Sequence, residues 1–130
     1  TFEAPCPLSE EENALILSVA EGLKSSVPCT ACRYCCDGCP MGLDIPKMIA
    51  TYNELRIAPS TNAAMWLEFA PEEKQPAACI GCGACAAACP QGIDIPAVLS
   101  DLTERLENIP KWKDICRERE EAARKLMAGK

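Results

Sequence analysis

The pattern C-x2-C-x2-C-x3-C-P occurs twice in this chain of 130 residues, and no other feature restricts the possible folds as strongly. The first copy starts at Cys29 and reads CTACRYCCDGCP, and the second starts at Cys79 and reads CIGCGACAAACP. At an offset of fifty residues all four cysteines coincide, as do the Pro, Gly, Asp, Ile and Pro that follow. The chain therefore contains an internal duplication of one cysteine loop and the segment after it.

The chain has little ordinary hydrophobic material from which to build a core. Its hydrophobic fraction of 48% includes eleven cysteines, whereas aromatic residues make up only 5%. A small domain with a thin core needs a further staple, which can be disulfides, bound metal or a partner surface. Disulfides of a secreted protein are disfavoured, because eleven is an odd number and no basic segment followed by an apolar one opens the chain. We expect a reducing, cytoplasmic setting.

The charge and hydropathy of the chain restrict the classes of partner that it can bind. The formal net charge of −6 argues against binding to nucleic-acid phosphates. No apolar stretch approaches the roughly 20 residues that a membrane-spanning helix needs. We therefore expect neither nucleic acid nor membrane as a partner. An acidic surface suits a basic protein face, although surplus glutamate also keeps a small domain soluble.

Helices are predicted at both ends of the chain. Ser9 followed by Glu12 forms a capping box that starts a helix over 9–24, and SSVP breaks this helix before the first cysteine loop. The charged tail predicts a helix over 111–128, whose charge run we interpret as a solvated face. No run of alternating β-type residues occurs, so we predict an all-α fold.

Each cysteine loop is followed by a predicted helix. Asp44 and Asp94 can cap these helices, and a proline two residues later is tolerated in the first turn. Together with the cysteine loops, these helices define a first repeat over 29–56 and a second over 79–107. Apolar residues recur on one helical face in both repeats. They are Ile45, Met48, Ile49, Tyr52 and Leu55 in the first, and Ile95, Val98, Leu99, Leu102 and Leu106 in the second.

The cysteine spacing predicts iron–sulfur ligation. Three thiolates at intervals of three residues can each reach a different iron of one four-iron, four-sulfur cluster, and the fourth iron needs a thiolate from elsewhere. In two-cluster ferredoxins the fourth cysteine of each run ligates the other cluster. We therefore predict two 4Fe–4S clusters with crossed ligands. The predicted ligands are Cys29, Cys32, Cys35 and Cys89 for the first cluster, and Cys79, Cys82, Cys85 and Cys39 for the second.

Structural zinc is the competing interpretation, because eight cysteines suffice for two tetrahedral sites. Zinc ribbons, however, pair two C-x2-C motifs across a long gap, and the third cysteine of each run has no role in a zinc ribbon.

Three cysteines are not among the eight predicted cluster ligands. Cys36 can substitute for its neighbour Cys35 but is interpreted as a bystander, and Cys6 and Cys116 are interpreted as ordinary thiols.

The two cysteine loops differ in bulk, and we expect their clusters to differ in potential. Small residues such as Gly81 and Gly83 let backbone amides approach cluster sulfurs in the second loop, and such hydrogen bonds raise the potential. The first loop carries Arg33, Tyr34 and Asp37 instead.

From the PLSEEE helix through both motifs, the chain resembles the C-terminal ferredoxin-type segment of iron–sulfur aldo/keto reductases. The stretches that carry the resemblance are VPCTACRYCCDGCPMGLDIPKMIATYNEL and PEEKQPAACIGCGACAAACPQGIDIP. The resemblance implies a single α-helical ferredoxin-like domain over 1–130 with two 4Fe–4S clusters, as a piece of a longer oxidoreductase. In that family the segment follows an NADPH-type barrel, which would be its partner in the parent chain.

The barrel of that family is not in this sequence. The chain has no histidine, and its only tyrosines are Tyr34 and Tyr52, so we place no carbonyl-reduction site here and expect this segment alone not to be catalytic. The predicted function is electron transfer between the parent active site and a redox protein or cofactor. The alternatives are a metal-stabilised cap or assembly domain without electron transfer, and a free-standing ferredoxin.

Overall fold

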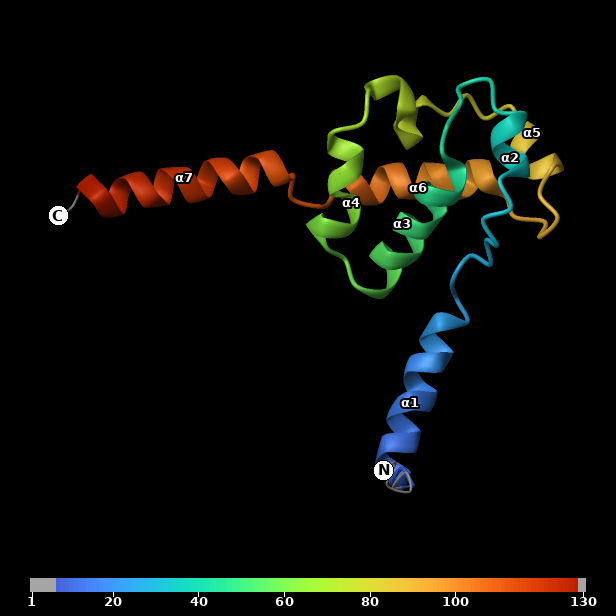
Figure 1. The fold of residues 1–130 in the computed structure, drawn as a ribbon, viewed down its shortest axis with the longest axis horizontal. Coiled ribbons are helices and arrows are strands. Elements are labelled where there is room, and N and C mark those ends of the chain that lie inside the picture. Colours follow the sequence, from blue (N-terminus) through green and yellow to red (C-terminus); the bar gives the residue numbers. More distant parts are fainter. Residues whose placement is uncertain (1–6, 129–130) are drawn as a thin grey trace, which may run out of the picture.

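The computed structural model describes residues 7–128, and all regular structure in that range is helical, which confirms the all-α prediction (Figure 1). The helices are α1 (Glu10–Leu23), α2 (Tyr34–Asp37), α3 (Ile45–Ile57), α4 (Thr61–Glu68), α5 (Ala84–Ala87), α6 (Ile95–Glu107) and α7 (Trp112–Ala128). Two 3-10 turns, η1 (Glu72–Lys74) and η2 (Pro76–Ala78), lie between α4 and α5. Helices α2 to α6 form one body, from which α1 and α7 project (Figure 1).

Helix α1 begins with the predicted capping box. The Ser9 hydroxyl accepts a hydrogen bond from the Glu12 backbone N–H at 3.2 Å, and the Glu12 carboxylate accepts one from the Ser9 N–H at 2.8 Å. The helix nevertheless buries none of its residues, and large apolar side chains such as Leu15 and Leu17 are exposed. Local capping therefore defines α1 without any packing against the body.

The core lies where α3 packs against α6, the two helices that follow the cysteine loops. Each presents the apolar face expected from its sequence, because the apolar residues recur at helical spacing. The side chains exposed by less than 2% are all aliphatic or Met and come from the two repeats: Leu43, Ile45, Met48, Ile49, Leu55, Ile95, Leu99 and Leu102. Val98 and Leu106 of the predicted faces are half-buried against this cluster.

The two repeats differ at the start of these helices. Asp94 caps α6 as predicted, since its carboxylate accepts a hydrogen bond from the Ala97 N–H at 3.2 Å. Asp44 occupies the same position before α3 but makes no capping bond, so that prediction was wrong. Its carboxylate instead pairs with the guanidinium of Arg33 at 3.2 Å. The Asp44 carboxylate thus has the guanidinium of Arg33 as its partner in place of a backbone N–H of α3.

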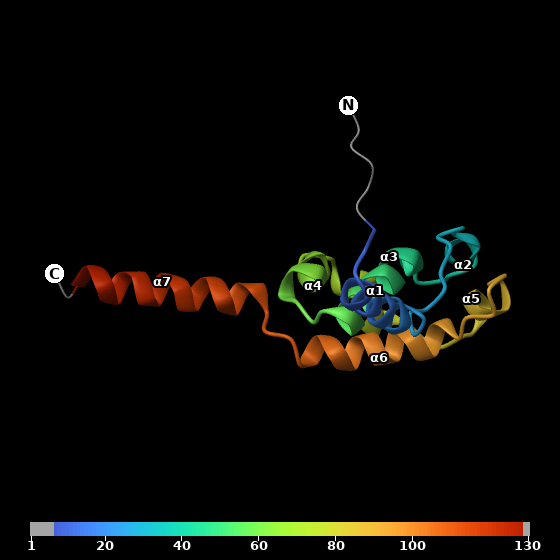
Figure 2. The same cartoon turned by 90° about the horizontal axis from the view of Figure 1, so that it is seen from below.

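Helix α7 is attached to the body only at its start. The Glu68 carboxylate accepts a hydrogen bond from the Trp112 N–H at 2.6 Å, and Trp112 and Ile115 are half-buried near α4. The rest of the helix extends away from the body, with Leu126 exposed (Figure 2). This matches a solvated charged face. Within residues 7–128, no helix combines the length and apolar character needed to cross a membrane.

Candidate metal centres

Both cysteine loops adopt the same unusual backbone path. Ala31 and Arg33 have φ values of +54° and +68°, and their counterparts Gly81 and Gly83 have values of +66° and +76°. These left-handed residues place the loop around its cysteines before a single helical turn, α2 or α5, presents the third thiol. Glycine adopts this conformation without strain, whereas alanine and arginine do so at a cost.

Two cavities lie beside these loops, and each is lined by four cysteines. Their sizes are similar, about 320 and 300 Å³ including the open solvent at their mouths. We call them the first and second cavity after the motif that supplies three of the thiols. The first contains Cys29, Cys32, Cys35 and Cys89, and the second contains Cys79, Cys82, Cys85 and Cys39.

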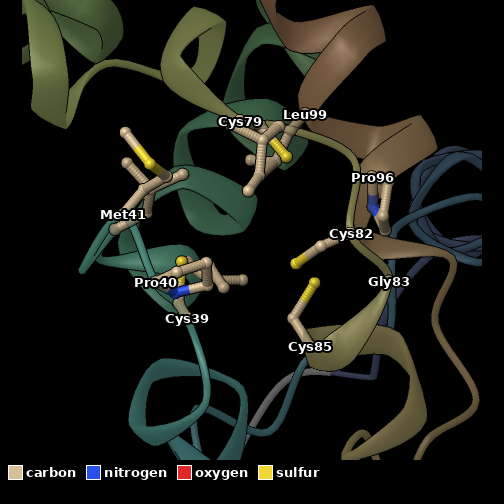
Figure 3. Close-up of a pocket in the computed structure, with 12 residues that line it drawn as sticks. Cys39, Pro40, Met41, Cys79, Cys82, Gly83, Cys85, Pro96 and Leu99 are labelled. Atoms are coloured by element: carbon tan, nitrogen blue, oxygen red, sulfur yellow. The ribbon is translucent and has the colours of Figure 1, made fainter.

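The second cavity shows how the two halves of the chain meet (Figure 3). The sulfurs of Cys79, Cys82 and Cys85 point into one space, across which lie Cys39 and Pro40 from the first motif. The rest of the wall is apolar and includes side chains from α3, α6 and the loop before α3. The fourth cysteine of one repeat thus faces the three leading cysteines of the other.

The thiols surround a space and do not converge on a point. A tetrahedral zinc ion holds its sulfurs about 2.3 Å from the metal, which brings them to roughly 4 Å from one another. Among residues 7–128, no group of three or more Cys, Asp or Glu converges closely enough to hold one ion. A cluster of four irons spreads its ligands over four corners, and four thiols around one space are a donor set that fits such a cluster.

Comparison with known protein families identifies the fold around these cavities. The sequence profile of the 4Fe-4S dicluster domain matches residues 28–93, just over half of the chain, and includes both motifs. The chain belongs to this family. The protein is therefore a ferredoxin-type iron–sulfur domain that binds 4Fe–4S. No curated protein and no solved structure matched the chain in the two other comparisons.

Burial within the dicluster domain controls the charge of two candidate ligands. Burial, with a smaller effect of neighbouring Cys36, raises the pKa of the Cys35 thiol to about 12. Burial also raises the pKa of Cys85, the counterpart in the second loop. A buried thiolate needs a compensating cation, and metal ligation requires the thiolate form. Both thiols therefore stay protonated at neutral pH until metal displaces the proton.

Cys36 and Cys116 line neither cavity. Cys36 is half-buried against the core beside Cys35, and Cys116 is half-buried on α7. The predicted thiol Cys6 lies outside the described residues. All ten cysteines within residues 7–128 are free, so the described part of the domain contains no disulfide staple.

Several lining residues of the dicluster domain were missed by the sequence reasoning, which concentrated on cysteines. Thr30 and Gln91 line the first cavity, and Met41 and Ile80 line the second. All four lie next to a cysteine or two residues from one. The alignment of the two copies at an offset of fifty could have identified these positions, because it pairs Thr30 with Ile80 and Gln91 with Met41 and so places each pair equivalently beside its cysteines.

Proposed function

We propose that the dicluster domain binds two 4Fe–4S clusters, one in each cavity, and passes single electrons between them. The observation that carries this proposal is the composition of the cavities, each of which gathers three thiols of one motif and the fourth thiol of the other. The cysteine spacing supports the same crossed ligand sets. When bound, such a cluster supplies reversible one-electron chemistry.

The chain contributes ligands, rigidity and exclusion of water. Ile45 and Ile95 begin the two central helices, are both 1% exposed, and line opposite cavities. The α3–α6 contact therefore holds the two cavities in one rigid unit and shields their inner walls from solvent. Fixed, apolar surroundings tune the potential of a cluster, because burial is one of the protein's means of setting it.

We further propose that the domain serves an aldo/keto reductase-type oxidoreductase in the reducing cytoplasm. The sequence resemblance supports this assignment, and the partners would be the barrel of the parent chain and a redox protein or cofactor. Sequencing the gene upstream of the codon for Thr1 tests it. We expect an in-frame (β/α)8 barrel; an unrelated upstream frame would overturn this part of the proposal while leaving cluster binding intact.

A structural cap is the second candidate function, and α1 favours it. This helix buries no residue, and Leu15, Leu17 and Val19 are each more than half exposed. Such a face suits a neighbouring protein surface, and bound clusters would contribute folding energy whether or not electrons pass. Reversible reduction separates the two functions, because a purely structural cluster has no need to cycle.

The test of cluster binding is iron and acid-labile sulfide analysis of the anaerobically prepared 130-residue chain, with electron paramagnetic resonance after dithionite reduction. We expect about eight irons and eight sulfides per chain and a signal from two interacting reduced clusters. Two zinc ions without sulfide would overturn the electron-transfer proposal. Clusters that cannot be reduced and reoxidised would favour the cap.

A further inference from the structure

The two cavities are built from equivalent positions of the duplicated sequence, which allows a position-by-position comparison. Every residue that lines the first cavity has its counterpart, fifty residues away, in the lining of the second. The cysteines are identical in the two sets, and the aliphatic pairs, such as Ile49 and Leu99, are equivalent in character. Any electrostatic difference between the side chains of the two linings therefore comes from the few pairs that differ in polarity.

Three pairs differ in polarity, and all three differ in the same direction. The first cavity has Thr30, Arg33 and Gln91, whereas the second has Ile80, Gly83 and Met41. Thr, Arg and Gln supply hydroxyl, guanidinium and amide donors, and the side chains opposite them supply none of comparable strength. The exposed wall of both cavities is mostly apolar, but donor-bearing side chains border only the first, and one of them carries a permanent positive charge.

Arg33 is held in this wall at a cost to the backbone. Its φ is +68°, and the counterpart Gly83 has the same left-handed conformation without a Cβ. Asp44 orients the guanidinium by an ion pair at 3.2 Å and gives up the capping role that Asp94 retains. Both repeats contain the aspartate, so the arginine is the charge that distinguishes them.

We infer that Arg33, assisted by Thr30 and Gln91, makes the first cavity the preferred site for an added electron. The inference rests on the proposed binding of two clusters. Adding an electron makes a cluster more negative, and a nearby cation and hydrogen-bond donors favour that state, whereas an apolar wall disfavours it. An electron released at the second cavity would be taken up at the first, so the second is oxidised as the first is reduced.

One cation approaches the second cavity from outside its wall. The Lys74 ammonium donates hydrogen bonds to the backbone carbonyls of Met41 at 2.7 Å and Gly42 at 3.3 Å. Lys74 and Arg33 are both exposed, so water screens both charges. Lys74, however, is absent from the lining of the second cavity. Arg33 lines its cavity directly.

The small residues of the second loop were expected to raise the potential there. Ala31 and Arg33, however, adopt the same left-handed backbone as Gly81 and Gly83, so both loops present their amides alike. Arg33 should therefore decide the order of the two potentials.

The test is a potentiometric titration of the anaerobic, cluster-loaded chain, with dithionite as the one-electron donor and paramagnetic resonance as the readout. We expect two one-electron steps. Arg33→Gly, which copies the second loop, should lower the upper potential so that the ratio of reduced to oxidised cluster at fixed potential falls about tenfold, or about 59 mV. The lower step should stay in place.

Three further variants keep the test decisive. Arg33→Gln removes the charge and retains a Cβ, so it should lower the upper step as well, whereas Arg33→Lys should largely preserve it. Lys74→Met should affect the upper step little. If Arg33→Gly leaves both steps unchanged or moves only the lower one while eight irons remain bound, this inference fails and cluster binding stands. A chain without clusters would instead overturn the proposed function.

Discussion

At the scale of single residues, the backbone strain of the first cysteine loop stands out against the second. Ala31 has a φ of +54°, and its counterpart Gly81 has +66°. An L-residue with a Cβ pays roughly 1 to 2 kcal/mol for this conformation. The first loop therefore carries this strain at two residues, Ala31 and Arg33. The Arg33 side chain lines the first cavity, where we propose a role for its charge, whereas Ala31 lines neither cavity.

Replacing Ala31 by glycine should stabilise the protein. We expect Ala31→Gly to raise the free energy of unfolding by about 0.5 to 1 kcal/mol, because strain is relieved at little further cost. Urea unfolding followed by tryptophan fluorescence measures the change. Ala50→Gly on the exposed side of α3 is the matched control and should lower the same free energy by about 1 kcal/mol. A loss of stability in both variants would refute the strain at Ala31.

At the scale of elements, a partly buried polar contact joins the two central helices. The Tyr52 hydroxyl of α3 donates a hydrogen bond to the Asp101 carboxylate of α6 at 2.5 Å, and Arg105 pairs with the same carboxylate at 3.1 Å. Burial and the Asp101 hydrogen bond raise the pKa of Tyr52. The Tyr52 hydrogen bond and Arg105 lower the pKa of Asp101. The pair is thus held as neutral phenol and carboxylate.

Removing the Tyr52 hydroxyl should weaken the α3–α6 contact. We expect Tyr52→Phe to lower the free energy of unfolding by about 1 to 2 kcal/mol, since the lost bond is to a charged acceptor that is itself partly exposed. Tyr34→Phe is the matched control and should change nothing, because Tyr34 is 61% exposed. Equal effects of the two variants would contradict this role of Tyr52.

The same contact has a defined pH range. The raised pKa of Tyr52 means that its contribution is present below the ordinary tyrosine value of 10.0 and is lost as pH rises through the higher folded value. The lowered pKa of Asp101 means that its contribution is present above 3.8 and is lost as pH falls through a still lower value. Between these limits, the stability difference between wild type and Tyr52→Phe should be constant in urea titrations. A slope near neutrality would contradict the assignment.

Removing the two serine N-caps should have different effects: one on the stability of a single helix and the other on the stability of the whole body. Ser9 caps α1, which buries nothing, and Ser60 caps α4, which buries Ala64 and Leu67. Ser9→Ala should reduce hydrogen-exchange protection in α1 only, whereas Ser60→Ala should lower the global free energy of unfolding by about 1 kcal/mol. Exchange measured by mass spectrometry and urea unfolding give the two readouts. A global loss in Ser9→Ala would mean that α1 is coupled to the body.

At the scale of the whole molecule, the cavities tie distant halves of the chain together. Each contains one cysteine that is distant in sequence from the other three: Cys39 lies 40 residues before Cys79 in the second cavity, and Cys89 lies 54 residues after Cys35 in the first. If both clusters form, the two halves of the body cannot separate on unfolding without breaking iron–thiolate bonds. Metal would then supply the staple that the thin core lacks.

Pairs of cysteine substitutions test the crossed arrangement. Cys39→Ala combined with Cys79→Ala removes two ligands of one predicted cluster, and we expect about four irons to remain. Cys39→Ala combined with Cys29→Ala removes one ligand from each predicted cluster and should lose nearly all iron and global stability. Iron analysis with circular dichroism reports both. Cys36→Ala is the control and should retain about eight irons; the opposite order of the two pairs would show that the ligands do not cross.

The sequence alone determined the elements whose causes are local. Capping by Ser9, the helical recurrence of apolar residues after each motif and the spacing of cysteines act between neighbours along the chain, and they predicted the all-α fold and the candidate ligands. The tertiary structure decided which remote atoms meet. Asp44 pairs with Arg33 in place of capping α3, α1 stays unpacked, and Thr30 and Gln91 become cavity walls. Those outcomes depend on how α3 packs against α6, and no single segment contains that information.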